Sequence, residues 1–424
     1  MLLTCRGCGA TVDPLGLSPW ACPRRDAAGL TDVDHVLVLS RESVQSVALP
    51  RDRTGGAGVN PFVRYRARLG SYAAATEAGW SDAQFVDTVG SLDDAVVAVL
   101  GSGFTVTPTT SQPTLATAVG VDGLWVKDET GNVSGSHKAR HLFGLALWLA
   151  VRSPADDDAR LAIASCGNAA LGAGVIAAAM RRPLDVYVPV WADESVVARL
   201  VGLGANILRC ERREGEVGDP CVLRMREAVA GGSLPFGCQG PDNGLTIDGG
   251  RTIGWELAEQ APGLVAVYVQ MGGGALASSL ARGLAEGGSD ARVIAVQTEG
   301  CAPFDRAWRR VEQVGLDEAV HHRSAAMWPW ESEPTSAATG ILDDETYDWA
   351  GVVRGVLDSG GGSVVAPEEA VLRAHEFAHE HTSVDVDATG SAGLAGLLAH
   401  VNEVASDGRL VGPVAVLFTG VTRH

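Results

Sequence analysis

The 424-residue sequence has no apolar run of the ~20 residues needed to cross a bilayer. Its N-terminus also lacks the basic region and apolar stretch of a signal peptide. Excess positive charge is absent too: the net charge is −18, whereas binding to a nucleic-acid backbone requires a basic surface. We therefore expect a cytoplasmic protein with neither a membrane nor a nucleic acid as partner.

Aromatic residues are few, at 5%, whereas glycine and alanine are frequent, which is typical of helices packed closely over a sheet. The eight cysteines are scattered and do not form the framework of a small disulfide-rich domain, so we expect reduced thiols. At this length, two domains are expected.

The sequence of residues 1–40 predicts a separate unit that resembles a zinc ribbon in which one ligand is missing. Cys5-x2-Cys8 and Cys22 give three ligands, but "CPRR" ends in Arg25 where a second C-x2-C pair would place a fourth cysteine. His35 is an alternative fourth ligand at an unusual spacing. Because tetrahedral zinc needs four ligands, we expect metal to be absent or weakly held, and the unit to be a relic held by packing.

Strands and helices alternate along most of the chain after an irregular region at 41–115, which contains the loop "DRTGGAGVNPF". Buried strands are expected in "RLAIASC", "LDVYVPV", "LVAVYVQ", "ARVIAVQ" and "VAVLFTG", and helices of small residues lie between them. This alternation predicts an α/β fold with mostly parallel sheets covered by helices on both faces.

Ligands of open α/β sheets bind at the carboxyl ends of strands, so the turns after strands are the candidate sites. In "LWVKDETGNVSGSHKARHLFGLALWLAV", Lys138 lies where a polar turn becomes an apolar helix. A lysine at a helix entry is commonly a solvated surface residue. The apolar helix that follows makes partial burial, and hence a reactive amine, plausible.

Three further turns carry groups that suit ligands. In "ASCGNAALG", Ser165, Asn168 and the amides of a helix start suit a carboxylate, although Asn168 could simply cap the helix. Gly272–Gly274 run from a strand into a helix and suit a lone phosphate, although close packing of helix on strand is an alternative. Thr419 ends the last strand beside Gly420.

A reactive lysine, a monophosphate cradle and polar groups for an aromatic ring together match pyridoxal 5′-phosphate. Lys138 would then form a Schiff base with the cofactor. The glycine loop is neither G-x-G-x-x-G nor a P-loop, so a dinucleotide or a nucleoside triphosphate is disfavoured.

These motifs resemble those of fold-type II, tryptophan-synthase-β-like pyridoxal-phosphate enzymes, and within them threonine synthase. The lysine segment is similar to K-x-E-x-x-N-P-T-G-S-F-K-D-R, with Lys127, Glu129, Asn132, Lys138 and Arg140 at the matching positions. The "SCGN" turn, the "GGGAL" loop, "FVRYRARLG" and residues 336–398 extend the likeness over nearly the whole chain. His137 and Ala139 depart from the pattern, as does "TTSQPTL", which leaves the substrate open.

The resemblance implies a role for each candidate. Lys138 would be the catalytic base, Asn168 would bond the cofactor's ring oxygen, and Thr419 would face its ring nitrogen. The remaining residues of the cofactor site would be Gly272, Gly273, Gly274, Ala275, Leu276 and His137, and those of the substrate site Ser136, Ser165, Cys166 and Gly167. It also implies a homodimer, a large domain of residues 41–145 and 240–424, and a small closing domain of residues 146–239.

A neutral hydroxyl at the ring nitrogen favours elimination or replacement over transamination, because it stabilises a pyridinium less than a carboxylate would. We expect a threonine-synthase-like lyase acting on an activated amino acid such as O-phosphohomoserine. The alternatives are a serine/threonine ammonia-lyase or a β-replacement enzyme of secondary metabolism. A protein that kept the fold for binding only is an alternative of another class.

Overall fold

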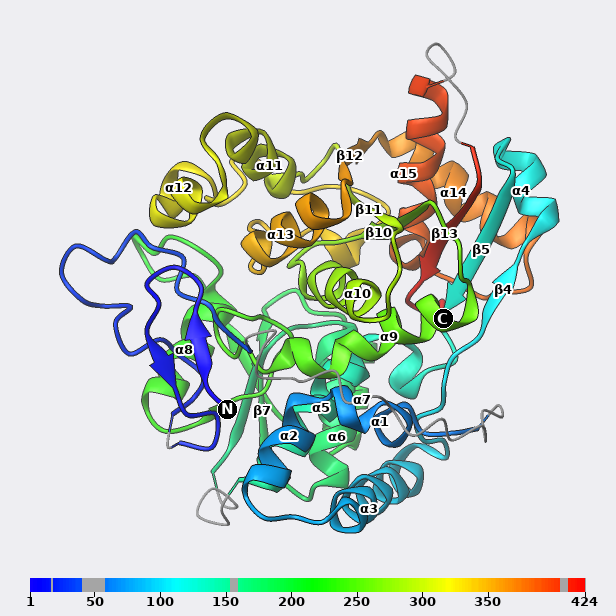
Figure 1. The fold of residues 1–424 in the computed structure, drawn as a ribbon. Helices are drawn as coiled ribbons and strands as arrows, with labels where there is room; N and C mark the ends of the chain where they lie inside the picture. The colour runs from blue at the N-terminus through cyan, green and yellow to red at the C-terminus, as the bar shows by residue number, and fades with distance from the viewer. Residues whose placement is uncertain (17, 40–57, 153–158, 405–410, 424) are drawn as a thin grey trace.

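The computed structural model describes residues 1–16, 18–39, 58–152, 159–404 and 411–423, which form three sheets and the helices around them (Figure 1). Six strands form the largest sheet, in the order β12 (Gly362–Ala366), β11 (Arg292–Thr298), β10 (Ala266–Gln270), β13 (Pro413–Phe418), β5 (Gly123–Asp128) and β4 (Thr109–Ser111). All neighbouring pairs are parallel except β4 with β5. The central strands are Val-rich and almost fully buried, as parallel strands covered on both faces must be.

Two sets of helices cover the two faces of this sheet, and each set shares its own cluster of buried side chains with the strands. One set is α9 (Thr246–Gln260), α10 (Ala275–Glu286), α11 (Pro303–Val314), α12 (Leu316–His321) and α13 (Trp349–Ser359). The other is α4 (Pro113–Val119), α14 (Glu368–His381) and α15 (Ala388–Val404). The predicted α/β architecture is therefore confirmed.

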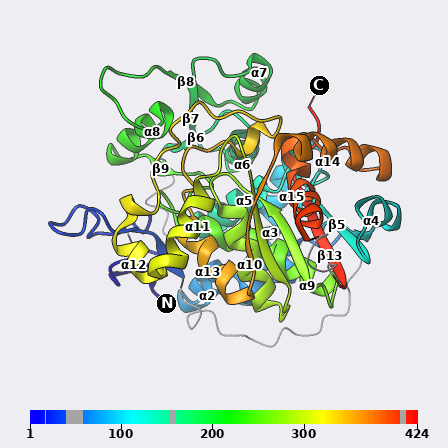
Figure 2. The same cartoon turned by 90° about the horizontal axis from the view of Figure 1, so that it is seen from above.

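The second sheet is fully parallel, in the order β8 (Asn206–Cys210), β7 (Leu184–Pro189), β6 (Leu161–Ala164) and β9 (Leu234–Pro235). Its strands pack with α5 (Lys138–Val151), α6 (Asn168–Ala179), α7 (Glu194–Gly202) and α8 (Pro220–Ala230). Seen from above, β6 to β9 with α7 and α8 lie at one end of the molecule, away from β5 and β13 (Figure 2).

Helix α5 connects the two sheets, because it packs on α6 at one side and on α9 at the other. A Cβ on Gly144 would come within 2.7 Å of the Gly249 Cα, so α5 and α9 cross at a pair of glycines that admits no side chain. The expected domain boundary at 145/146 falls inside this continuous helix. The division into a large and a small domain therefore stays a prediction.

The described part of residues 41–115 is largely helical, so the expectation of an irregular region was wrong there. It contains α1 (Pro61–Arg64), α2 (Gly70–Glu77) and the 19-residue helix α3 (Asp82–Leu100). Ser81 and Gln84 form a capping box at the start of α3, and Gly101 ends it in the left-handed conformation. Positions 52–57 of the expected loop lie outside the described residues.

The N-terminal unit is an antiparallel sheet in the order β2 (Thr11–Val12), β1 (Leu3–Cys5) and β3 (Leu37–Leu39). Short 3₁₀ segments are η1 (Arg66–Arg68), η2 (Val133–Gly135), η4 (Arg323–Ala325) and η5 (Thr339–Ile341). Among the helices of the described residues, none combines the length and the apolarity that crossing a bilayer requires.

Candidate active site

The turn that carries Lys138 joins the end of β5 to the start of α5 and lies against the end of β13. His137 N–H donates to the Thr419 carbonyl at 3.4 Å, and Val421 N–H donates to the Gly135 carbonyl at 3.0 Å. Ser136 and Gly420 form an isolated antiparallel bridge. The structure thus brings Lys138 and Thr419 together, although they lie far apart in the sequence.

The chain has only two lysines, Lys127 and Lys138. Lys127 is fully buried, and its Nζ lies 2.6 Å from Glu256 Oε2, 2.8 Å from the Thr107 carbonyl and 3.0 Å from Gln260 Oε1. All three of its protons therefore have acceptors, so this amine has a structural role and is not available to react with a ligand.

Arg140 completes the buried network beneath the Lys138 turn. Its guanidinium donates to Glu129 at 2.8 Å and to Glu256 at 2.6 Å, and all three side chains are fully buried. Glu129 also accepts from Asn132 at 2.9 Å. Glu129, Asn132 and Arg140 belong to the lysine motif, so motif residues before and after Lys138 hold the turn in place.

Lys138 itself is only partly buried, and its Nζ has no hydrogen bond or ion pair to any described residue. The neighbouring imidazoles of His137 and His141 are buried. Burial, reinforced by the charge of Lys138, lowers the pKa of His137 well below its usual value and that of His141 to about 4. Both rings are therefore neutral near pH 7.

Asn168 is the first residue of α6, and it contacts the segment after β13. Its Oδ1 accepts from Arg423 Nη2 at 2.6 Å and Nε at 3.2 Å, while Arg423 Nη2 also donates to the Ser134 carbonyl at 2.8 Å. With Oδ1 so occupied, the amide of Asn168 presents Nδ2 as a donor. Arg423, which the sequence did not single out, ties Asn168 to the Lys138 turn.

The alternative that Asn168 merely caps α6 was wrong, because the N-cap is Gly167, which has no side chain to cap with. The first N–H groups of this 12-residue helix therefore have no side-chain acceptor, which suits an anionic ligand. Ser165 and Cys166 form the preceding turn, in which Gly167 N–H donates to Ser165 Oγ at 3.4 Å.

Thr419 is buried, and its hydroxyl oxygen accepts from Gln270 Nε2 at 2.8 Å. Gln270 is the last residue of β10, and the same Nε2 also donates to the Gly390 carbonyl at 2.5 Å. Because two acceptors fix this group as the amide nitrogen, the Thr419 hydroxyl keeps its own proton for a third partner. No sequence signal pointed to Gln270.

The three glycines lie between β10 and α10, and Gly274 is the N-cap of α10 with φ at +89°. Backbone N–H groups at a helix N-terminus in this conformation form an anion cradle. A Cβ on Gly272 would collide with the carboxylate of Asp343, and one on Gly273 would come within 3.1 Å of the Tyr347 ring. The segment 343–347 therefore lies directly against the loop.

Asp343 brings a carboxylate to this cradle. Burial raises its pKa to about 6, while Lys138 and the Gly273 N–H act to lower it. Lys138 and the glycine loop both act on the Asp343 carboxyl group. The predicted amine and the predicted phosphate site therefore lie in one region.

Comparison with known proteins matches residues 100–420 to a family model described as pyridoxal-phosphate dependent enzyme. The chain belongs to the pyridoxal-phosphate-dependent enzyme family. The cofactor predicted from the sequence, pyridoxal 5′-phosphate, is thereby confirmed.

Relatives within the pyridoxal-phosphate-dependent family carry the names of lyases. The chain is 27% identical to an L-threonine ammonia-lyase of Thermotoga maritima over 283 residues, which are 65% of this chain and 62% of that protein. It is 32% identical to a phenylserine dehydratase of Ralstonia pickettii over 186 residues, which are 43% of this chain and 53% of that protein. The chain thus spans less than two thirds of either relative.

Solved structures of pyridoxal-phosphate-dependent enzymes share the fold. Maize serine racemase superimposes with a TM-score of 0.62 at 19% identity, over 79% of this chain and 94% of that one. The processed form of threonine deaminase isoform 2 from Solanum lycopersicum gives a TM-score of 0.60 at 17% identity, over 81% of this chain and 91% of that one. At these identities, the likeness shows the fold alone.

The residues present fit the family's cofactor. The glycine loop offers an anion cradle, and both ring nitrogens of the buried His137 lack a hydrogen-bond partner among the described residues. Lys138 offers the amine, Asn168 Nδ2 a donor, and Thr419 a hydroxyl proton. Each of these groups is left unsatisfied by the described protein and is complementary to a phosphate, an aldehyde or a pyridine ring.

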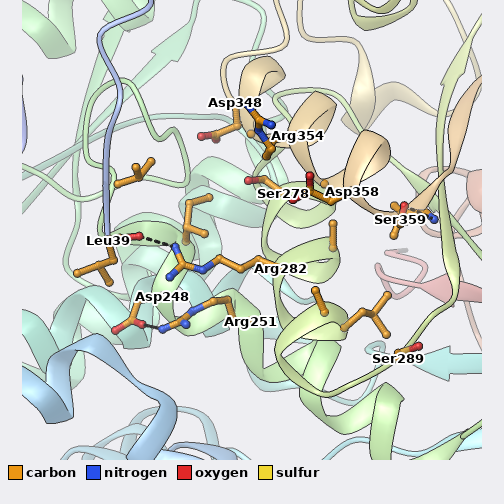
Figure 3. A pocket seen from close by; sticks show the side chains of 18 of the residues that line it. Leu39, Asp248, Arg251, Ser278, Arg282, Ser289, Asp348, Arg354, Asp358 and Ser359 are labelled. Carbon is orange, nitrogen blue, oxygen red and sulfur yellow. Dashed lines mark hydrogen bonds and ion pairs between the residues drawn. The ribbon is translucent and has the colours of Figure 1, made fainter. Parts of the chain in front are cut away.

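A separate cavity of ≈580 Å³ lies elsewhere, between the N-terminal unit and helices α9, α10 and α13 (Figure 3). The charged side chains on its wall are those of Arg6, Arg251, Arg282, Arg354, Asp248, Asp290, Asp348 and Asp358. None of the predicted site residues contributes to this wall, so the cofactor site is distinct from the cavity.

Proposed function

We propose that this protein is an ammonia-lyase that eliminates a leaving group from the β-carbon of a hydroxy amino acid such as serine or threonine. The observation that supports this proposal most strongly is the hydrogen bond from Gln270 to the Thr419 hydroxyl. Because this hydroxyl oxygen accepts, its own proton is available for the cofactor's ring nitrogen. A ring held by a hydroxyl donor stays largely neutral, which disfavours transamination. The names of the relatives support the same class of reaction.

Lys138 is the proposed base at the substrate Cα. Bound pyridoxal phosphate supplies an electron-withdrawing ring that stabilises negative charge at this carbon. The Lys138 amine has no other partner among the described residues, and the neutral His137 and His141 do not compete for the proton that it takes up. Lys127 cannot replace it, because its amine is enclosed by acceptors.

The start of α6 is the proposed site of the substrate carboxylate. Gly167 leaves the first N–H groups of the helix uncapped, and Ser165 adds a hydroxyl beside them. A carboxylate at this point is stabilised by the N-terminal end of the helix. Asn168, oriented by Arg423, is proposed to bond the ring oxygen of the cofactor.

Threonine synthesis from O-phosphohomoserine is the competing proposal, based on the motif resemblance. The two reactions differ in their products, so one experiment separates them. Purified holoenzyme is incubated with serine, threonine, phenylserine or O-phosphohomoserine, and ammonia, keto acid, phosphate and threonine are quantified. We expect ammonia and keto acid in equal amounts from a β-hydroxy amino acid.

If O-phosphohomoserine is the one substrate that reacts, and it gives phosphate and threonine, the proposal is wrong and the protein is a threonine synthase. Inactivity towards all substrates in protein that carries the cofactor on Lys138 would favour the binding-only alternative. The Thr419→Asp variant tests the role assigned to Thr419, because a carboxylate at this position would stabilise the protonated form of the ring nitrogen. We expect that variant to accumulate pyridoxamine phosphate and a keto acid, with Thr419→Ser as the matched control.

The homodimer, the cytoplasmic location and the closure of residues 146–239 over the site stay predictions. Because the expected boundary lies inside the continuous helix α5, a movement of this kind would place its hinge at an end of that helix.

A further inference from the structure

The N-terminal unit gathers the three cysteines of the degenerate ribbon and one histidine in a single cluster. The candidate ligand atoms of Cys5, Cys8, Cys22 and His35 all lie within 4.8 Å of one another. Cys8 Sγ is 3.5 Å from Cys22 Sγ, and Cys5 Sγ is 3.4 Å from His35 Nδ1. The fourth ligand that the sequence pattern lacked is therefore supplied in space by His35.

The first two thiols belong to a tight turn between β1 and β2. Cys5 N–H donates to the Ala10 carbonyl at 2.7 Å, and Gly9 N–H donates to the Cys5 carbonyl at 3.0 Å, with Gly9 at φ +68°. A Cβ on Gly7 would lie 2.7 Å from the Asp34 carbonyl oxygen, so only glycine fits at position 7. This turn points both thiols to the same side.

The third thiol lies in a second turn, at "CPRR". Arg24 N–H donates to Cys22 Sγ at 3.4 Å, and Arg25 N–H donates to the Cys22 carbonyl at 3.2 Å. Arg25 takes the place of the missing cysteine. The place of the fourth ligand is reached instead by the segment that leads into β3, which contains His35.

Strand pairing explains why His35 arrives there despite its unusual spacing. Cys5 pairs with Leu37 across β1 and β3, and Arg6 N–H donates to the Val36 carbonyl at 2.9 Å, which places His35 beside the first turn. His35 Nε2 lies 2.9 Å from the Leu30 carbonyl, an acceptor, so Nε2 carries the ring proton. Nδ1 is then the unprotonated nitrogen, and it faces the thiols.

We propose that the N-terminal unit binds one structural Zn²⁺ ion through four side chains: Cys5, Cys8, Cys22 and His35. Tetrahedral zinc with bonds of about 2.3 Å to sulfur and about 2.0 Å to nitrogen places neighbouring donors about 3.5–3.8 Å apart. The Cys5–His35 and Cys8–Cys22 separations of 3.4 and 3.5 Å are close to this range, and no separation among the four ligand atoms exceeds 4.8 Å. Three thiolates and an imidazole form a closed set of ligands typical of structural zinc.

The cluster lies close to the cavity beside the N-terminal unit. Arg6 follows Cys5 directly, and its side chain lines the same cavity as Asp348. Asp348 in turn accepts from Gly240 N–H at 3.1 Å and donates its own N–H to the Gly273 carbonyl at 2.8 Å. Asp348 therefore connects this cavity to the glycine loop.

Metal analysis of the full-length holoenzyme, purified after growth with added zinc, tests the proposal. We expect about one zinc per chain in the wild type, and a loss of most of this metal in Cys22→Ser and His35→Ala. His35→Cys should restore it, because thiolate is also a zinc ligand. The controls are Cys210→Ala and His321→Asn, which change a thiol and an imidazole outside the cluster and should keep the full amount.

A second measurement needs no variant, so a failure of Cys22→Ser to fold does not leave the question open. Exchange of the metal for Co²⁺ in the wild type should give the intense visible bands of tetrahedral cobalt and a thiolate charge-transfer band. Metal-free wild-type protein with no cobalt bands would overturn the proposal. A Cys8–Cys22 disulfide found by mass spectrometry in freshly purified protein would overturn it as well.

Discussion

The two lysines of this chain lie on either side of one turn, yet their surroundings are opposites. Lys127 is fully buried, and three acceptors surround its amine. Lys138 is partly buried beside two neutral imidazoles, and no described residue accepts from its amine. The same functional group is therefore structural in one place and available for chemistry in the other.

The difference shows how a site can be recognised without a ligand. A buried charge whose partners are complete contributes to the fold, and its loss weakens the whole protein. A group whose partners are missing has its partner elsewhere, in the cofactor or the substrate. The buried ring nitrogens of His137 belong to the second kind.

Replacing Lys138 should have the largest effect. We expect Lys138→Ala to lose activity by at least about 10²–10⁴-fold, because it removes the base that acts on the substrate. Borohydride reduction of the wild type should fix the cofactor to the peptide that contains Lys138. Lys127 is the only other lysine in the sequence. Labelling of its peptide would show that Lys127, and not Lys138, carries the cofactor.

Replacing Lys127 should affect stability instead. Lys127→Met leaves Glu256 with one cation fewer in a dry environment, and we expect a loss of about 3–5 kcal/mol in the free energy of unfolding. Urea denaturation measures this loss. The folded variant should still carry the cofactor on Lys138, and an unchanged stability would show that the Lys127 network is dispensable.

Arg423 tests whether the orientation of Asn168 matters. Arg423→Gln removes the charged donors to Asn168 Oδ1, a bond worth about 1.5 kcal/mol, so we expect kcat/KM to fall about tenfold. The absorption band of the bound cofactor should shift as well, because Asn168 is proposed to bond its ring oxygen. A stability loss without any spectral shift would make Arg423 a purely structural residue.

Asp343→Asn should give the smallest effect and the opposite sign. The variant removes a negative charge beside the phosphate cradle, and at contact distance such a charge costs about 1 kcal/mol, so affinity for pyridoxal phosphate should rise about fivefold. Because the pKa of Asp343 is about 6, the advantage should be complete above that pH and disappear as the pH falls through it. Equilibrium titration of the apoenzyme at several pH values measures both trends, and weaker binding would mean that Asp343 is a ligand of the phosphate.

The sequence was most informative where neighbours in the chain are also neighbours in space. Lys138, the glycine loop and the start of α6 each lie in a segment that leads from a buried strand into a helix, so local pattern was sufficient to propose them as site residues. Helix α3 was missed because its apolar residues are interrupted by acidic ones, although its capping box at Ser81 and Gln84 was a usable signal.

The missed groups depend on register between distant segments. Gln270 reaches Thr419 only because β10 and β13 are paired, and Arg423 reaches Asn168 only because the chain after β13 turns across α6. His35, which the sequence offered only as an alternative ligand at an unusual spacing, joins the cysteines through the pairing of β1 with β3. No spacing rule encodes these contacts, since each is a property of the sheet and not of the motif.

The Arg423 contacts also set the order in which this protein can fold. Arg423 bonds to Asn168 across 255 residues and to Ser134 across 289, so the site is closed by contacts of very high sequence separation. The entropy lost in closing such loops is recovered only after both parallel sheets have formed. We therefore expect the binding site to be among the last regions that are completed during folding.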